Sequence, residues 1–274
     1  MFPISLVLPE LPPIKIVDVG AMAAGEDPYQ RLAEQLACEI IGFDAQEEEC
    51  RKLNAAAGAG RSFLPYVIGD GSAQTFYQCA AAHSSSLLEP NRELLEHFTG
   101  FAEMLRVVAR QPVGTRRLDD VPQAAGADFL KLDVQGGELM VLDGAPRTLR
   151  DVLVVHTEVE FVPLYKGQPL FSDIDARMRS HGFALHKMPF LGLRPFAPFP
   201  VEIERATQYL WADVVYVRDF MRFEALSPAQ LLKLAAVLHV NYDSFDLACA
   251  ALAAHDRQAG TRLQQDYLSY VSAP

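Results

Sequence analysis

Strand-like and helix-like segments alternate along the chain from residue 14 to residue 161. The strand-like segments are short apolar runs rich in β-branched residues. They lie at residues 14–20, 39–45, 62–70, 128–134 and 152–161, and two more follow at 183–188 and 212–218. This alternation predicts an α/β fold in which a mostly parallel sheet carries helices on both faces. Pro65 has no N–H to donate, so we expect the third strand at a sheet edge.

The pattern changes beyond residue 225, where three helical segments follow one another. Ser227 and Pro228 form a typical helix start. We therefore divide the chain into a domain at 1–222 and a C-terminal helical extension at 223–274. The first helix of the extension has an apolar face, which we expect to pack on the protein's own sheet rather than on another protein. A homo-oligomer is the open alternative.

Composition argues against several classes of function. The formal net charge of −11 and the lack of a Lys/Arg cluster in the sequence disfavour nucleic-acid binding. No apolar stretch reaches the ~18 residues of a membrane-spanning helix. The four cysteines form no CxxC pair and have no histidine at zinc spacing, so we expect reduced thiols and a cytoplasmic protein. The proline-rich N-terminal segment is unlike a signal peptide.

Acidic residues end two of the strand-like segments, and a glycine follows the first. Ligands of open α/β sheets bind beyond the carboxyl ends of the strands, which makes Asp18, Gly20 and Asp44 candidates for cofactor binding. Gly20 would let a ligand approach the backbone closely. Asp44 could accept hydrogen bonds from both ribose hydroxyls, or it could be an acid favoured at a helix start. The lack of a G-x-G-x-x-G motif disfavours a dinucleotide.

Two further segments at the same edge are less specific. Gly69 and Asp70, in the sequence VIGDG, could face an adenine or form a plain turn. The loop after them contains His83 and three serines at 84–86. Such a polar loop could form a wall of the substrate site or be solvated.

The stretch DFLKLDVQGGELMVLDGA is the most informative in the chain. Asp133 ends a strand at the ligand edge, and the glycines at 136–137 then turn the chain. Asp133 is therefore a candidate for chemistry, with a capping carboxylate as the alternative. Glu138 begins a helix, where the dipole favours an acid. Lys131 and Asp133 can point the same way, and the alternative for Lys131 is a structural ion pair.

The stretch HTEVEF places three polar side chains on one strand face. His156, Glu158 and Glu160 share that face because strand side chains alternate. Polar groups are costly to bury without partners, so this face opens into a cleft or joins a hydrogen-bonded core. Asp133 with Glu158 could also hold a divalent cation, although we assign no metal.

Seven motifs occur along the chain in one order: DVGA, GFDA, SSSLLEPN, TRRLDD, DFLKLDVQGGELMVLDGA, EVEF and PLYKGQPLFSDID. In this series the chain resembles the FkbM-type S-adenosylmethionine-dependent methyltransferases, over roughly residues 14–218. The resemblance implies a class I methyltransferase, Rossmann-like sheet of seven strands whose last two form a reversed hairpin. It also implies S-adenosylmethionine as methyl donor and, usually, methylation of a hydroxyl on a sugar, polyketide or related small molecule.

The resemblance also implies roles for particular residues toward the cofactor. The methionine part would be contacted by Asp18, Gly20 and Ala21. The ribose would be contacted by Asp44 and Ala45, and the adenine by Gly69 and Asp70. Asp133 would lie near the sulfonium and the acceptor. In place of the family's glycine-rich turn this chain has Met22 and Ala24, with Gly25 shifted by one position. This difference implies a loop that holds the cofactor less closely.

Methyl transfer to a hydroxyl requires alignment of the reactants and removal of the hydroxyl proton. We assign the role of proton acceptor to Asp133, with Glu158 or His83 as the second choice. One alternative function is a catalytically weak or inactive cofactor-binding module that docks a partner protein, as the helical extension and the altered turn would allow. Another is an NAD-dependent oxidoreductase, which the missing dinucleotide motif disfavours.

Overall fold

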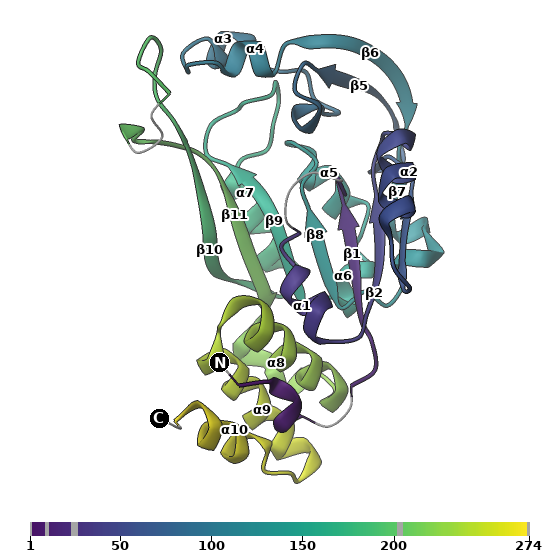
Figure 1. Cartoon of the computed structure of the whole chain (residues 1–274), viewed down its shortest axis with the longest axis vertical. Coiled ribbons are helices and arrows are strands. Elements are labelled where there is room, and N and C mark those ends of the chain that lie inside the picture. The colour runs from purple at the N-terminus through teal and green to yellow at the C-terminus, as the bar shows by residue number, and fades with distance from the viewer. Residues whose placement is uncertain (1, 9–10, 23–26, 202–204, 273–274) are drawn as a thin grey trace.

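The computed structural model describes all residues except 1, 9–10, 23–26, 202–204 and 273–274. Its centre is a seven-stranded sheet in the order β10-β11-β9-β8-β1-β2-β3. The strands are β1 Ile14–Val19, β2 Cys38–Phe43, β3 Arg61–Leu64, β8 Phe129–Leu132, β9 Val154–Glu160, β10 Phe183–Arg194 and β11 Gln208–Arg218. β11 is antiparallel to both of its neighbours, and the remaining pairs are parallel. This confirms the expected class I methyltransferase sheet with a reversed hairpin (Figure 1).

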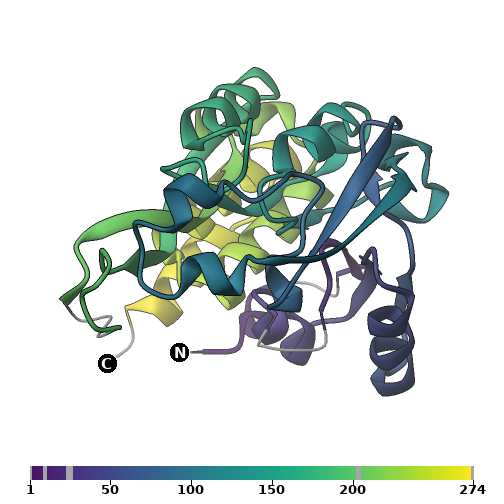
Figure 2. The same cartoon turned by 90° about the horizontal axis from the view of Figure 1, so that it is seen from above.

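Helices cover both faces of the sheet, as the alternating pattern predicts. They are α1 Gln30–Gln35, α2 Glu47–Ala56, α5 Glu138–Asp143, α6 Thr148–Asp151, α7 Phe171–Ser180, α8 Pro228–Tyr242, α9 Phe245–Ala259 and α10 Leu263–Val271. Val17 and Leu130 pack with α5, α6 and α7 on one face. Ile16 and Phe129 point to the other face, where α1, α8 and α9 cover them. Figure 2 shows α1 and α2 on one side of the sheet and the α5–α7 layer on the other.

The C-terminal helices complete the core of the sheet. Ser227 caps α8 with a side chain that accepts from the Gln230 N–H, and Pro228 is the first helical residue, as expected. Leu231 and Leu238 are fully buried in the same cluster as Ile16 of the sheet. The helical extension is thus confirmed, and it packs on the protein's own sheet. The division at 222 and 223 separates stretches of sequence that share one hydrophobic core.

Much of the chain between β3 and β8 lies over the carboxyl ends of the strands, at the top of Figure 1. This part, residues 73–114, is called the upper layer and contains β5 Ala73–Cys79, α3 Arg92–Leu95, α4 Phe101–Met104 and β6 Val107–Gly114. Two short strands, β4 Ile68–Gly69 and β7 Arg116–Arg117, flank it in the sequence. β5 and β6 form an antiparallel pair, and β4 pairs with β7. The upper layer therefore covers the carboxyl-end edge of the sheet, where ligands were expected to bind.

Two of the predicted strands differ in the structure. The segment 62–70 is not one strand: β3 lies at the sheet edge as expected but stops before Pro65, and β4 pairs outside the main sheet. The strand expected at 183–188 is longer in the structure, because β10 continues to Arg194 as half of a long hairpin. Helix α7 begins at Phe171, and the Leu170 N–H just before it donates to Asp173 Oδ2 at 2.9 Å.

Two whole-chain expectations can be compared with the structure. Among the described residues, no helix is long and apolar enough to cross a membrane. All four cysteines are free thiols, of which Cys50 and Cys79 are buried.

Candidate active site

A cavity of about 540 Å³ lies between the carboxyl ends of the strands and the upper layer. This volume is in the range typical of small-molecule sites. It is lined by six of the residues expected to bind or react: Gly20, Asp44, Ala45, His83, Asp133 and Glu158. The structure thus brings together side chains from β1, β2, β8, β9 and the polar loop of the upper layer.

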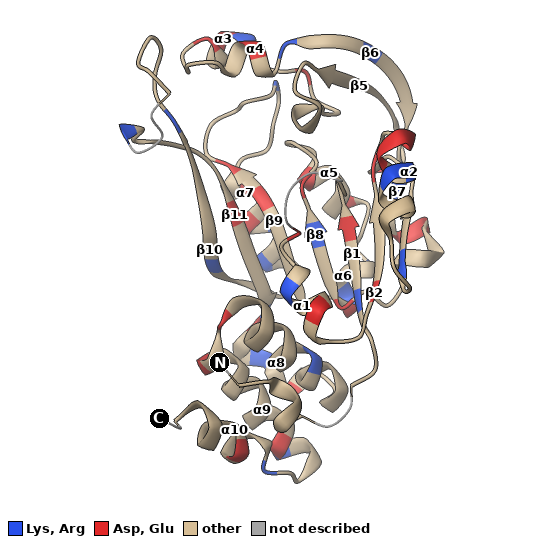
Figure 3. Ribbon diagram, viewed as in Figure 1, with Lys and Arg blue, Asp and Glu red and all other residues tan. Residues whose placement is uncertain are grey.

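The floor of the cavity is the carboxyl half of one sheet face. Lys131 of β8 pairs with His156 of β9, and Glu158 of β9 pairs with Asp213 of β11. All four side chains line the cavity. Figure 3 shows this polar region as red and blue segments on strands that are otherwise tan. The face predicted from HTEVEF therefore opens into a cleft, and hydrogen bonds also connect its side chains.

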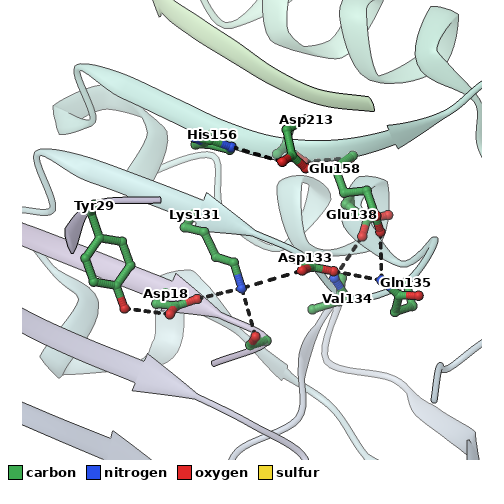
Figure 4. Close-up of polar contacts among 12 residues, drawn as sticks. Asp18, Tyr29, Lys131, Asp133, Val134, Gln135, Glu138, His156, Glu158 and Asp213 are labelled. Carbon is green, nitrogen blue, oxygen red and sulfur yellow. Dashed lines mark hydrogen bonds and ion pairs between the residues drawn. The ribbon is translucent and has the colours of Figure 1, made fainter. Parts of the chain in front are cut away.

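Lys131 is the centre of a buried ion-pair network beneath the cavity (Figure 4). Its Nζ lies 3.1 Å from Asp18 Oδ1 and 3.9 Å from Asp133 Oδ2, and it donates to the Gly20 carbonyl at 2.8 Å. Burial lowers the pKa of Lys131, but the charges of Asp18 and Asp133 outweigh it and raise that pKa above its ordinary value. Tyr29 donates to the other oxygen of Asp18 at 2.7 Å. Asp18, only 1% exposed, therefore supports the site from below and does not line it.

Gly20 follows β1 and packs against the backbone of Asp133, which follows β8. Its φ is +88°, and a Cβ added there would stand 1.9 Å from the Asp133 carbonyl oxygen, so only glycine fits. Ala21 does not line the cavity, contrary to expectation. It is buried, and its N–H donates to the carbonyl of Phe43. Met22 lines the cavity, whereas Ala24 and Gly25 lie outside the described residues.

Asp44 follows β2 and lies both beside the start of α2 and in the lining of the cavity. Its Oδ1 accepts from the Gln46 N–H at 2.6 Å at the start of α2, while the residue also lines the cavity. Burial raises the pKa of Asp44 to about 6. Its carboxylate is therefore in position to accept hydrogen bonds from paired hydroxyls of a ligand.

Gly69 and Asp70 do not line the cavity, which corrects their expected position. Once Pro65 ends β3, the chain leaves the main sheet, and Asp70 turns outward to accept from the N–H and hydroxyl of Ser72. Hydrogen bonding by Ser72 lowers the pKa of Asp70, as expected of a turn carboxylate. From this segment the cavity is instead lined by Tyr66, Val67 and Ile68.

Gln135 is a site residue that the sequence did not reveal. Its φ is +56°, a strained value for a residue with a side chain. Its Nε2 donates to Asp133 Oδ1 at 2.8 Å and to Glu158 Oε2 at 2.7 Å, so one amide connects the two carboxyl groups. The Tyr165 hydroxyl lies 3.2 Å from its Oε1, and Ser86 donates to its carbonyl at 2.7 Å. Strain maintained by so many contacts is typical of functional positions.

Three neighbouring carboxyl groups, those of Asp133, Glu138 and Glu158, differ in environment. Burial, followed by the charge of Asp133, raises the pKa of Glu158 well above its ordinary value. Burial also raises the pKa of Glu138 to about 7, but Glu138 accepts from the N–H groups of Val134 and Gly136 and acts as a structural cap. The side chain of Asp133 is 43% exposed, so it is the most accessible of the three for a ligand.

The polar loop forms a wall of the cavity. His83 is exposed and lines it, together with the serines at 84–86. Ser84 and Ser86 are buried. The Ser84 carbonyl accepts a hydrogen bond from the Tyr165 hydroxyl, and the Ser86 hydroxyl donates one to the Gln135 carbonyl. Within the part of the chain that the structure describes, no three His, Cys, Asp or Glu residues are arranged to hold a metal ion.

Comparison with known proteins agrees with this topology. The model of the "Methyltransferase FkbM domain" matches residues 18–185, more than half of the chain. The 2-O-methyltransferase NoeI of Sinorhizobium fredii (strain NBRC 101917 / NGR234) is 35% identical over 96 residues. That match spans 34% of this chain and only 37% of NoeI.

Two solved structures are similar at low sequence identity. One is magnesium protoporphyrin IX methyltransferase (ChlM) from Synechocystis PCC 6803 with bound SAM, at 12% identity and a TM-score of 0.40, covering 76% of this chain and 71% of that one. The other is an S-adenosylmethionine-dependent methyltransferase from Mesorhizobium loti, at 12% identity and a TM-score of 0.34, covering 78% and 95%. On the evidence of the domain match, the chain belongs to the FkbM methyltransferase family, whose methyl donor is S-adenosylmethionine.

Proposed function

We propose that this methyltransferase acts on a hydroxyl oxygen of a small molecule, such as a sugar or a polyketide, and that Asp133 is the base. The supporting observation is the position of Asp133: its accessible carboxylate lies on the cavity floor beside Gly20, oriented by the amide of Gln135. The name of the Sinorhizobium relative, a 2-O-methyltransferase, also supports oxygen as the methylated atom.

The residues on the β1 and β2 side of the cavity fit S-adenosylmethionine. Gly20 lines the cavity with its backbone, beside which the methionine part would lie, and Asp44 would present a carboxylate to the ribose hydroxyls. Ala45 is small enough to leave space beside it. When bound, the cofactor supplies an electrophilic methyl group on a positively charged sulfur.

The acceptor then occupies the β9 and β11 side. The sheet order places β8, with Asp133, between the cofactor side and the strands that carry Glu158 and Trp211. Phe101 and Arg194 line the same side. Asp133 therefore lies between the two halves, where a base must stand to accept the hydroxyl proton as the new bond forms.

The test is Asp133→Asn, measured by turnover and by calorimetric titration with S-adenosylhomocysteine. Turnover should fall by about 10²- to 10⁴-fold while the product still binds, because the amide keeps the shape but accepts no proton. Glu96→Gln, which changes an exposed carboxylate that does not line the cavity, is the matched control and should change neither value.

Two results would contradict the proposal. Full turnover by Asp133→Asn would reject the base. A wild-type protein that binds no S-adenosylhomocysteine would instead favour the alternative of a partner-docking module. Mass spectrometry of methylated products from a panel of hydroxylated small molecules would identify the acceptor.

A further inference from the structure

The last turn of α8 contacts the cavity walls from outside the matched family domain. Asn241, Tyr242 and Asp243 are consecutive, and their side chains reach the segment before α1, the cavity floor and α1 itself. These three residues, the α8 end, lie more than fifty residues beyond the end of the family match. The contacts are polar and directional, whereas most of the buried side chains along the rest of α8 are apolar.

The first contact fixes the wall of the cavity next to Gly20. Asn241 Nδ2 donates to the carbonyl of Pro28 at 2.6 Å. Pro28 and its neighbour Asp27 line the cavity on the side assigned to the cofactor. The following residue, Tyr29, is hydrogen-bonded to Asp18 of β1, so this short segment is attached to the sheet on one side and to α8 on the other.

The second contact ties α1 to the α8 end. Asp243 accepts from both terminal nitrogens of Arg31, at 2.9 and 3.0 Å, in a bidentate pair. Asp243 has a φ of +52°, so the helix stops there and its side chain turns toward α1. Hydrogen bonding from Arg31 lowers the pKa of Asp243, which keeps it ionised at neutral pH.

The third contact reaches the floor. The Tyr242 hydroxyl lies 3.1 Å from His156 Nδ1, and its ring stacks on Phe129, which in turn meets Tyr29 edge-on. Burial raises the pKa of Tyr242, so the hydroxyl keeps its proton. Lys187 of β10 donates to the Tyr242 carbonyl at 2.7 Å. One helix end thus connects β10, the floor and the wall.

We propose that the α8 end is a positioning device for the cofactor: it holds the segment Asp27–Tyr29 in the place where that segment forms one wall of the S-adenosylmethionine site. The inference rests on the proposed location of the cofactor. It gives the C-terminal extension a role in binding in addition to its role in the core. Asn241 contacts this segment directly at the Pro28 carbonyl, and Asp243 supports the segment indirectly by binding Arg31 of α1.

A purely structural role for α8 predicts something different, and the chain offers a matched control. Lys233, two turns earlier on α8, donates to Asp128 Oδ2 at 2.6 Å, and both side chains are largely buried. This contact also ties α8 to the sheet, but at the amino end of β8, away from the cavity. Its loss should lower stability without changing the cofactor site.

The experiment compares Asn241→Ala, Asp243→Asn and Lys233→Ala in the full chain. S-adenosylhomocysteine affinity is measured by calorimetry and stability by thermal unfolding. Asn241→Ala should weaken binding about 3- to 10-fold, as expected for one lost hydrogen bond, and Asp243→Asn by a smaller factor. Asn is tolerated at a positive φ, so Asp243→Asn keeps the helix end intact. Lys233→Ala should lower the melting temperature but leave affinity unchanged.

The outcomes separate this inference from the proposed function. If the wild type binds and all three variants bind equally well, the positioning role is wrong and the cofactor site stands. Affinity losses that follow the melting temperature in all three variants, Lys233→Ala included, would likewise overturn it. A wild type that does not bind would reject the cofactor site on which the inference depends.

Discussion

On the sheet face that α8 covers, the amino half of the strands carries apolar side chains and the carboxyl half carries polar ones. Ile16, Phe129 and Val154 belong to the first half and are fully buried under the helices. Asp133 and Glu158, a few residues farther along β8 and β9, belong to the second and line the cavity. The same strands therefore supply stability at one end and chemistry at the other, and substitutions in the two halves should have separable effects.

The largest expected effect is on stability, in the amino half. Leu234 of α8 is fully buried in the same hydrophobic cluster as Ile16 and Phe129 of the sheet. Leu234→Ala should lower the free energy of unfolding by about 2–5 kcal/mol, through lost burial and the cavity left behind. Chemical denaturation measures this value. Affinity for S-adenosylhomocysteine in the folded variant should match the wild type, and a parallel loss of affinity would show that the two halves are not separable.

The carboxyl half should show the opposite behaviour at Gln135. Gln135→Ala removes the donor that Asp133 and Glu158 share, so turnover should drop about 10- to 100-fold, as expected for hydrogen bonds to charged groups. Removal of the side chain from a position with positive φ changes stability little by comparison. Steady-state kinetics should show the loss in kcat rather than in KM for the cofactor. An unchanged kcat would mean that the amide only fills space.

The smallest effect is a pH dependence at Asp44. Its pKa of about 6 in the folded protein exceeds the ordinary value of 3.8, so the folded state binds a proton more tightly than the unfolded chain. Asp44 therefore disfavours folding progressively as pH rises from about 4 to about 6, and protonation removes that cost. In ligand binding the ionised form is required, so affinity for S-adenosylhomocysteine should fall roughly three- to fivefold between pH 7.5 and pH 5.5.

Asp44→Asn isolates this contribution from other titrating groups such as Glu138. The variant should bind more weakly than the wild type at pH 7.5, yet its affinity should be flatter over the same pH range. Calorimetry at the two pH values measures both. An equal pH dependence in wild type and variant would remove Asp44 from the ribose site.

Much of the fold follows from local patterns. Buried strands such as β1 and β8 could be predicted because apolar runs between turn residues have few alternatives, and the start of α8 because Ser227 and Pro228 form a helix cap. The end of β3 was missed even though Pro65 was the available signal. Because β3 ends before Pro65, Asp70 lies in an exposed turn and not in the cavity, where it had been expected.

The site was less predictable wherever contacts join distant parts of the chain. Asp44 and Asp133 were found because each ends a strand. Gln135 was missed because its positive φ and its two carboxyl partners appear only in three dimensions. The contact between Tyr242 and His156 spans 86 residues, and no local pattern marks it.

The most direct test of the account is a crystal structure of the protein with S-adenosylhomocysteine. The ribose should contact Asp44, the methionine part should lie beside Gly20, and the sulfur should point toward Asp133 on the cavity floor. A ligand bound elsewhere, or one with its sulfur turned away from Asp133, would contradict the division of this sheet face into a supporting half and a reacting half.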